Sequence, residues 1–235
     1  MVFARSLIFV VLFYLWWTIF ALAMLPLLLC PRRWLVGPTR AQARVTASLL
    51  RAVCGVRVEF RGCENLPEGA ALIGAKHQCM FDTIAPLMVF TDAAYVMRDS
   101  LLKIPFYGWY SAKAGMIPID RQGHASALRR MLQAAKACIA ERRQVVIFPE
   151  GTRLPPGVSG EYKPGVAALY RALGVACVPM ATNSGVHWPA HGFLRRPGLI
   201  VYEFLEPIPP GLERREFMRL LEARVEAGST ALLAL

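Results

Sequence analysis

A histidine and an aspartate five residues apart are the pair in this sequence best suited to catalysis. His77 and Asp82 lie in residues 76–82, directly after the short apolar stretch at residues 70–74. An imidazole held by one carboxylate is a minimal general base, because the carboxylate fixes the tautomer and stabilises the imidazolium that forms. His77 is therefore a candidate base and Asp82 its orienting partner. The alternative is a structural histidine, since the spacing alone is not specific.

Two further runs place an arginine at the end of an expected strand. Residues 115–121 end in Asp120 and Arg121, and residues 148–153 run from an apolar stretch into Glu150, Gly151, Thr152 and Arg153. The arginine guanidinium matches phosphate oxygens. A glycine lets the backbone approach an anion, and its N–H can join a threonine hydroxyl in the cradle. The alternatives are a surface arginine paired with Asp120 and a plain turn after the second strand.

The elements that position these runs alternate between strands and helices. A fourth run, residues 178–184, also ends an apolar stretch in polar residues. We expect strands at residues 56–61, 70–74, 95–98, 115–119, 145–148, 175–181 and 199–205, and helices at residues 79–90, 124–143, 165–173 and 213–227. This order predicts an α/β fold with a mostly parallel or mixed sheet flanked by helices. Ligands in such sheets bind where strands end in loops.

The first 55 residues differ from the other 180 in charge. The chain has 27 Lys and Arg, 16 Asp and Glu, and a net charge of +11. No acidic residue precedes Glu59, and seven arginines do, so residues 1–58 carry +7 and residues 59–235 carry +4. We expect a membrane-anchoring helical head at residues 1–55 and one α/β domain at residues 56–235. The 55% hydrophobic content excludes disorder and collagen. The six cysteines show no disulfide or zinc spacing, which favours a reducing compartment.

An uncharged apolar run at residues 6–30 predicts a membrane anchor. As a helix it would be about 37 Å long, enough to cross a ~30 Å hydrocarbon core. Pro26 would kink or end the helix, so a hairpin or a shallow helix in one leaflet is also compatible. A cleaved signal peptide is the alternative, but the run is longer than such peptides need. Arginines after the run place the rest of the chain on the cytoplasmic side of the cytoplasmic membrane.

Residues 39–54 predict a basic amphipathic helix that is closed by Gly55. At 100° per residue, Arg40, Arg44 and Arg51 share one face. Near anionic lipid, each such arginine could contribute on the order of 1 kcal/mol. The alternative is an ordinary domain helix with a solvated arginine face.

Taken together and in this order, the four runs resemble the motifs of the lysophosphatidic acid acyltransferase family of glycerolipid synthesis, over residues 56–210. The resemblance implies transfer of a fatty acyl group from acyl-CoA or acyl-carrier protein to a lysophospholipid hydroxyl. The acceptor would be 1-acyl-sn-glycerol-3-phosphate, giving phosphatidic acid. His77 would be the base and Asp82 its partner. The glycerol phosphate would be bound by Arg121 and Arg153, with the help of Glu150, Gly151 and Thr152, and Glu150 would hold an arginine or the turn.

The resemblance also bears on cofactors and partners. It implies no metal and no organic cofactor beyond the thioester co-substrate. The expected partners are a phospholipid bilayer, the two lipid substrates and, for that donor, acyl-carrier protein, but no nucleic acid. Two other functions remain open: acylation of another lysolipid, such as a lyso-aminolipid, and an inactive membrane lipid-binding protein.

One position departs from the family pattern. The family commonly has serine two residues after the histidine, whereas this chain has Cys79. The thiol could pack there and accept a weak hydrogen bond. Alternatively, His77 could activate it as a nucleophile for a covalent acyl-enzyme.

Overall fold

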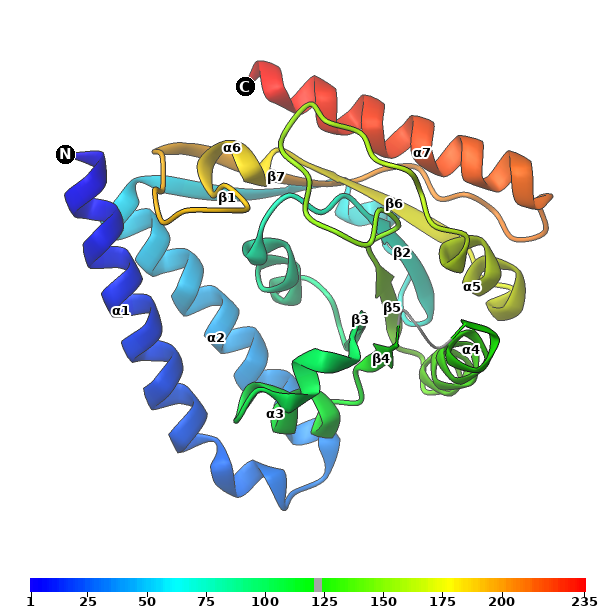
Figure 1. The fold of residues 1–235 in the computed structure, drawn as a ribbon, viewed down its shortest axis with the longest axis horizontal. Coiled ribbons are helices and arrows are strands. Elements are labelled where there is room, and N and C mark those ends of the chain that lie inside the picture. The colour runs from blue at the N-terminus through cyan, green and yellow to red at the C-terminus, as the bar shows by residue number, and fades with distance from the viewer. Residues whose placement is uncertain (121–123) are drawn as a thin grey trace.

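A computed structural model describes residues 1–120 and 124–235, and within them the chain forms one mixed seven-stranded sheet (Figure 1). The strand order is β1-β7-β6-β2-β5-β3-β4, and only β6 and β7 pair antiparallel. The strands are β1 (Val56–Arg61), β2 (Ala71–Ala75), β3 (Ala93–Arg98), β4 (Ile117–Ile119), β5 (Gln144–Ile147), β6 (Cys177–Thr182) and β7 (Gly198–Phe204). The expected fold class is confirmed.

Helices cover both faces of this sheet. They are α1 (Val2–Ala23), α2 (Val36–Leu49), α3 (Tyr107–Lys113), α4 (His124–Ala140), α5 (Gly165–Leu173), α6 (Ser184–His187) and α7 (Arg214–Ala231). Helices α4, α5 and α7 share one core cluster, and α1 and α2 pack into the cluster of the opposite face. In α7, Phe217, Leu221 and Val225 are fully buried at four-residue spacing. Each such side chain contributes about 1.5–3 kcal/mol through burial, so this stripe fixes α7 to the sheet.

The head folds back on itself and packs against the α/β part of the chain. Short turns at Leu25–Leu28 and Arg32–Leu35 join α1 to α2, so the two helices run alongside each other (Figure 1). One π-helical turn, Leu50–Cys54, extends α2. Gly55 ends it with φ +72°, a conformation that favours glycine, and this confirms the expected cap.

The arginines of the head are not all available to lipid. Arg32 contacts Asp92 at 2.7 Å and Glu141 at 2.9 Å, and Arg40 donates to the Phe90 carbonyl at 2.6 Å. Arg44 and Arg51 are exposed. The prediction that Arg40 shares a lipid-facing side with them is therefore wrong, because Arg40 ties α2 to the loop before β3.

The helix expected at residues 79–90 is replaced by two 3-10 turns, Met80–Thr83 and Ala85–Met88. The Asp82 carboxylate accepts the backbone N–H groups of Gln78 and Cys79, which holds the chain in a tight loop instead of an α-helix. Pro86 is the second residue of the second turn, where its missing N–H is tolerated.

Candidate active site

The runs identified in the sequence meet at one edge of the sheet. Strands β2, β5, β3 and β4 are adjacent and parallel, so their carboxyl ends open on the same side. A cavity of about 1160 Å³ lies there. Its walls come from α1, the loops after these strands, α3, and the first turns of α4 and α5.

The His77–Asp82 pair is formed. Nδ1 of His77 lies 3.1 Å from Oδ2 of Asp82, whose side chain is fully buried. Oδ2 also accepts the backbone N–H groups of Gln78 at 2.7 Å and Cys79 at 2.8 Å, and Oδ1 accepts the Tyr202 hydroxyl at 3.1 Å. Burial raises the pKa of Asp82, but the hydrogen bond and charge of His77 and the Cys79 N–H outweigh it, so the pKa lies below its ordinary value. The partner of His77 is thus a carboxylate at neutral pH.

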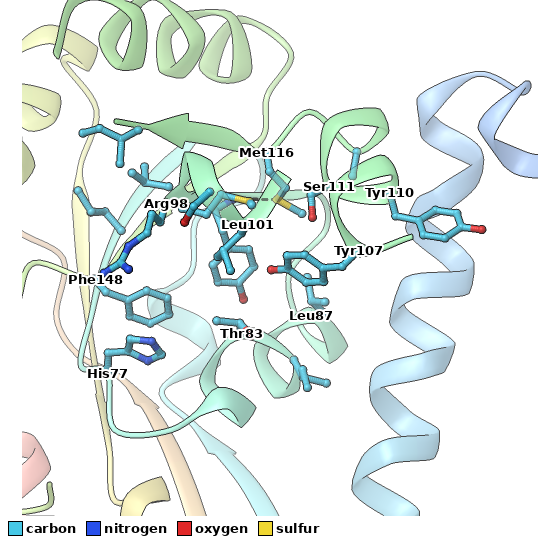
Figure 2. Close-up of a pocket in the computed structure, with 18 of the residues that line it drawn as sticks. His77, Thr83, Leu87, Arg98, Leu101, Tyr107, Tyr110, Ser111, Met116 and Phe148 are labelled. Atoms are coloured by element: carbon cyan, nitrogen blue, oxygen red, sulfur yellow. Dashed lines mark hydrogen bonds between the residues drawn. The ribbon is translucent and has the colours of Figure 1, made fainter. Parts of the chain in front are cut away.

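The His77 ring is held flat against Phe148. The two ring centroids are 4.0 Å apart with planes 18° from parallel, and Figure 2 shows these rings side by side. Leu154 donates its N–H to the His77 carbonyl at 2.9 Å. With Nδ1 facing Asp82, Nε2 is the nitrogen left to take a proton at the cavity, and the side chain is 15% exposed.

The turn after β5 presents cations to the same cavity. Gly151 has φ +67°, which favours glycine, and its N–H closes the turn onto the Phe148 carbonyl at 2.9 Å. Thr152 and Arg153 are exposed and line the cavity, as does Lys163 at the start of α5. Among the described residues, Nη1 of Arg153 donates one long hydrogen bond, of 3.3 Å, to the Ala190 carbonyl. This guanidinium can therefore turn toward an anion.

Glu150 lines the cavity, but its carboxylate is bound to a buried lysine. Its Oε1 accepts from Lys76 at 2.7 Å and from the Gly160 N–H at 3.3 Å, in a fully buried position. Burial raises the pKa of Glu150, and Lys76 offsets only part of that effect. Its ionic partner is thus a lysine instead of an arginine, and its bond to the Gly160 N–H joins the turn to the loop that follows.

The second and fourth runs have different outcomes. Asp120, which follows β4, lines the cavity, whereas Arg121 lies outside the described residues. Val178 and Pro179 lie in the interior of β6, where they pair with Ile73 and Gly74 of β2. The fourth run therefore holds in place the strand that carries His77.

Sequence reasoning missed two residues at this edge. Arg98 ends β3, is exposed and lines the cavity on the side of Phe148 and His77 (Figure 2). Like the other cations, Arg98 stands where an apolar strand ends, so the sequence pattern could have identified it. Lys76 is 1% exposed, and nothing in the sequence around it indicates that this lysine is buried with carboxylate partners.

Much of the cavity wall away from His77 is apolar or aromatic. Phe20, Ala21 and Leu22 of α1 contribute, together with Leu87, Leu101 and Met116 (the last three shown in Figure 2). Tyr110 of α3 donates its hydroxyl to the Ala21 carbonyl at 2.5 Å and so joins the wall to α1. The cavity thus combines a base, cations and an apolar compartment large enough for a hydrocarbon chain.

Cys79 does not have the properties of a nucleophile. Its side chain is fully buried, and its Sγ lies 3.4 Å from Oδ1 of Asp82. Burial and the Asp82 charge raise the pKa of the thiol well above its usual value, whereas a reactive cysteine needs a lowered pKa and access to substrate. The thiol donates to Asp82 and helps to hold its carboxylate.

We therefore expect Cys79→Ser to retain activity within about threefold, because a hydroxyl can donate to the same carboxylate oxygen. Steady-state rates of purified wild-type and variant protein check this. Loss of all activity in a folded Cys79→Ser variant would instead support the covalent acyl-enzyme.

Among residues 1–120 and 124–235 there is no group of three or more His, Cys, Asp or Glu side chains placed to hold a metal ion.

Comparison with known proteins identifies the family. A family model described as acyltransferase matches residues 57–183. Over 152 residues, the chain is 38% identical to a 1-acyl-sn-glycerol-3-phosphate acyltransferase of Pseudomonas aeruginosa, covering 65% of this chain and 59% of that protein. Over 167 residues it is 26% identical to the enzyme of that name from Borreliella burgdorferi, covering 70% and 66%. The chain thus spans about three fifths of the Pseudomonas relative.

The fold also matches a solved structure. The crystal structure of PlsC from Thermotoga maritima, a 1-acyl-sn-glycerophosphate acyltransferase, superposes with a TM-score of 0.83. The match covers 100% of this chain and 99% of that one at 23% identity, and at that identity it shows the fold alone. Because the family model covers more than half of the sequence, the chain belongs to the acyltransferase family.

Proposed function

We propose that this protein transfers a fatty acyl group from an acyl thioester to the free hydroxyl of 1-acyl-sn-glycerol-3-phosphate, giving phosphatidic acid. The observation that carries the proposal is one cavity that holds the His77–Asp82 pair, exposed cations and an apolar compartment. The names of the Pseudomonas and Borreliella relatives support the same acceptor. The donor is acyl-CoA or acyl-carrier protein, and no further cofactor is proposed.

In the proposed step, Nε2 of His77 takes the proton of the lipid hydroxyl as its oxygen attacks the thioester carbonyl. The tetrahedral intermediate collapses, the C–S bond breaks, and the imidazolium returns the proton to the leaving thiolate. Asp82 keeps Nδ1 protonated and stabilises the imidazolium between the two transfers. General base catalysis of this kind contributes about 10²–10⁴-fold.

Binding of the lipid phosphate falls to the cations at the cavity. Arg153 and Arg98 are exposed at its wall, and Thr152 and the Gly151 turn stand beside Arg153. A guanidinium binds phosphate oxygens through charge-assisted hydrogen bonds. The same role for Arg121 stays a prediction from the sequence.

We expect Arg153→Ala to raise the KM for 1-acyl-sn-glycerol-3-phosphate by about 10–100-fold, the effect of losing one or two charge-assisted hydrogen bonds. The KM for the thioester should stay within about twofold. Kinetics with each substrate varied in turn check this, with the exposed Arg171 on α5 replaced by Ala as control. A change in the thioester KM alone would show that Arg153 does not bind the acceptor phosphate.

A panel of lysolipids tests the function itself. Purified protein is incubated with acyl-CoA or acyl-carrier protein thioester and with acceptors that carry or lack a terminal phosphate, and products are read by mass spectrometry. Phosphatidic acid as the main product supports the proposal, and the faster thioester identifies the donor. Acylation of a lyso-aminolipid alone, or no product with any acceptor, would support one of the two rival functions.

We further propose that α1 lies in one leaflet of the cytoplasmic membrane, with the catalytic part on the cytoplasmic side. It is the one helix in the described residues that is long and apolar enough to span a membrane. Its buried aromatic residues, Phe9 and Phe13, pack against Trp188, whereas Val11, Leu15 and Ile19 are exposed. Both ends of α1 contact the α/β part of the chain, which favours a shallow position. A helix held against that part along its length cannot cross the bilayer while the α/β part stays in water.

These end contacts are specific. The Arg195 N–H donates to the Ser6 hydroxyl at 2.8 Å, and Tyr110 holds the Ala21 carbonyl. Cysteine labelling in vesicles with a membrane-impermeant maleimide tests the placement. Cys63, which is exposed on the α/β part, reports the side on which that part lies. Labelling of Val2→Cys from the same side as Cys63 supports a position in one leaflet, and labelling from the opposite side would show a spanning helix.

A further inference from the structure

The lysine directly before His77 is buried with all its hydrogens used. Lys76 is 1% exposed. Its Nζ donates to Oε1 of Glu150 at 2.7 Å, to both carboxylate oxygens of Glu226 at 2.8 Å, and to the Val158 carbonyl at 2.9 Å. An ammonium has three hydrogens, so these three partner groups satisfy it completely. A buried charge is retained only with such pairing.

The partners come from two separate parts of the chain, the loop after β5 and helix α7. Glu150 opens the turn that carries Arg153, and Val158 lies further along the same loop. The His77 carbonyl accepts the Leu154 N–H from this loop at 2.9 Å, and the Lys76 N–H is fixed to Met180 of β6. Glu226 lies on α7, outside the residues 57–183 that match the family model. The Lys76 ammonium therefore joins the segment that carries His77, the Glu150–Arg153 turn and helix α7.

Glu226 is itself fixed in place. Oε1 accepts the hydroxyl of Tyr162 at 2.9 Å, and Tyr162 is 5% exposed just before α5. The fully buried Leu221 and Val225 hold this stretch of α7 against the sheet. The Glu226 carboxylate is thus held in place and in turn fixes the position of the Lys76 ammonium.

We propose that Glu226, acting through Lys76, is a positioning residue that sets the place of the Glu150–Arg153 turn relative to His77. This inference rests on the proposed transfer to an acceptor that carries phosphate. Such an acceptor must reach Arg153 with its phosphate and His77 with its hydroxyl at once, and a misplacement of about 1 Å can cost about 10²-fold in rate. Glu226 shares the Lys76 ammonium with Glu150, and so it holds the lysine to which the turn is bound.

Replacement of Glu226 by Gln tests this, with Glu222→Gln as matched control. Glu222 lies one turn earlier on α7 and is exposed. We expect Glu226→Gln to lower kcat/KM for 1-acyl-sn-glycerol-3-phosphate about tenfold, through both a higher acceptor KM and a lower kcat. The KM for acyl-CoA and the rate of slow acyl-CoA hydrolysis by water should stay within twofold of wild type, because neither needs the Glu150–Arg153 turn. Glu222→Gln should match wild type throughout.

Two outcomes would overturn the proposal: wild-type acceptor constants in Glu226→Gln, or an equal fall in transfer and hydrolysis, which is what a general loss of folded protein produces. Acyl transfer by the wild-type protein is measured first, so failure of the proposed function is distinguished from failure of this inference.

Should Glu226→Gln not fold, Tyr162→Phe keeps every charge and removes one hydrogen bond to Glu226. It should lower acceptor kcat/KM two- to threefold with hydrolysis unchanged, and unchanged acceptor constants would contradict the proposal.

Discussion

Replacement of His77 by alanine is expected to lower kcat by about 10²–10⁴-fold while the protein stays folded. The variant loses the nitrogen that accepts the hydroxyl proton, and neither of two nearby carboxylates, Asp82 and Glu150, is free to replace it. Asp82 is fully buried, and Glu150 is committed to Lys76. A loss of 10³-fold corresponds to about 4 kcal/mol of transition-state stabilisation.

The fold should tolerate this change because the His77 side chain is 15% exposed at the cavity. Circular dichroism and thermal unfolding check that, alongside initial rates of phosphatidic acid formation. His191→Ala is the matched control, since His191 is an exposed histidine in the loop between α6 and β7. Activity of His77→Ala within tenfold of wild type would show that another group is the base.

The sequence was sufficient to predict the strands and the edge at which they bring residues together. The apolar runs at β2, β5 and β6 are fully buried strands, and each lacks the alternation of a half-exposed strand. Parallel strands bury both faces, so such runs are easily recognised. His77, Glu150 and Thr152 each follow one of these strands, and the rule that ligands bind at strand ends locates them.

Contacts between distant parts of the chain were beyond such rules. Lys76 and Glu226 are 150 residues apart in sequence, and the pairing depends on how α7 crosses the sheet. In the same way, the sequence of residues 79–90 predicts a helix, but the Asp82 carboxylate competes for the backbone N–H groups that would begin it. Short polar side chains override periodicity when their own hydrogen bonds hold a tight loop.

Replacement of Asp82 by asparagine is expected to lower kcat by about 10²–10⁴-fold, again with the fold retained. Two backbone N–H groups point at the Oδ2 position, so the amide oxygen of asparagine should occupy it. The amide NH₂ then takes the Oδ1 position, where the Tyr202 hydroxyl and the Cys79 thiol can turn to accept it. The loop and the His77 tautomer are preserved, and what is lost is the negative charge that stabilises the imidazolium.

This reasoning separates the charge of Asp82 from its structural role. Asp82→Ala would leave several buried donors without an acceptor and is expected to unfold the loop, so asparagine is the informative change. Tyr202→Phe is the control, because it removes a bond to Oδ1 and leaves the His77–Oδ2 contact intact, and its kcat should fall only a few-fold. Measured kcat and melting temperature of the three proteins decide the matter. If Asp82→Asn fell no further than Tyr202→Phe, the Asp82 charge would not take part in catalysis, and His77 would act as a base without it.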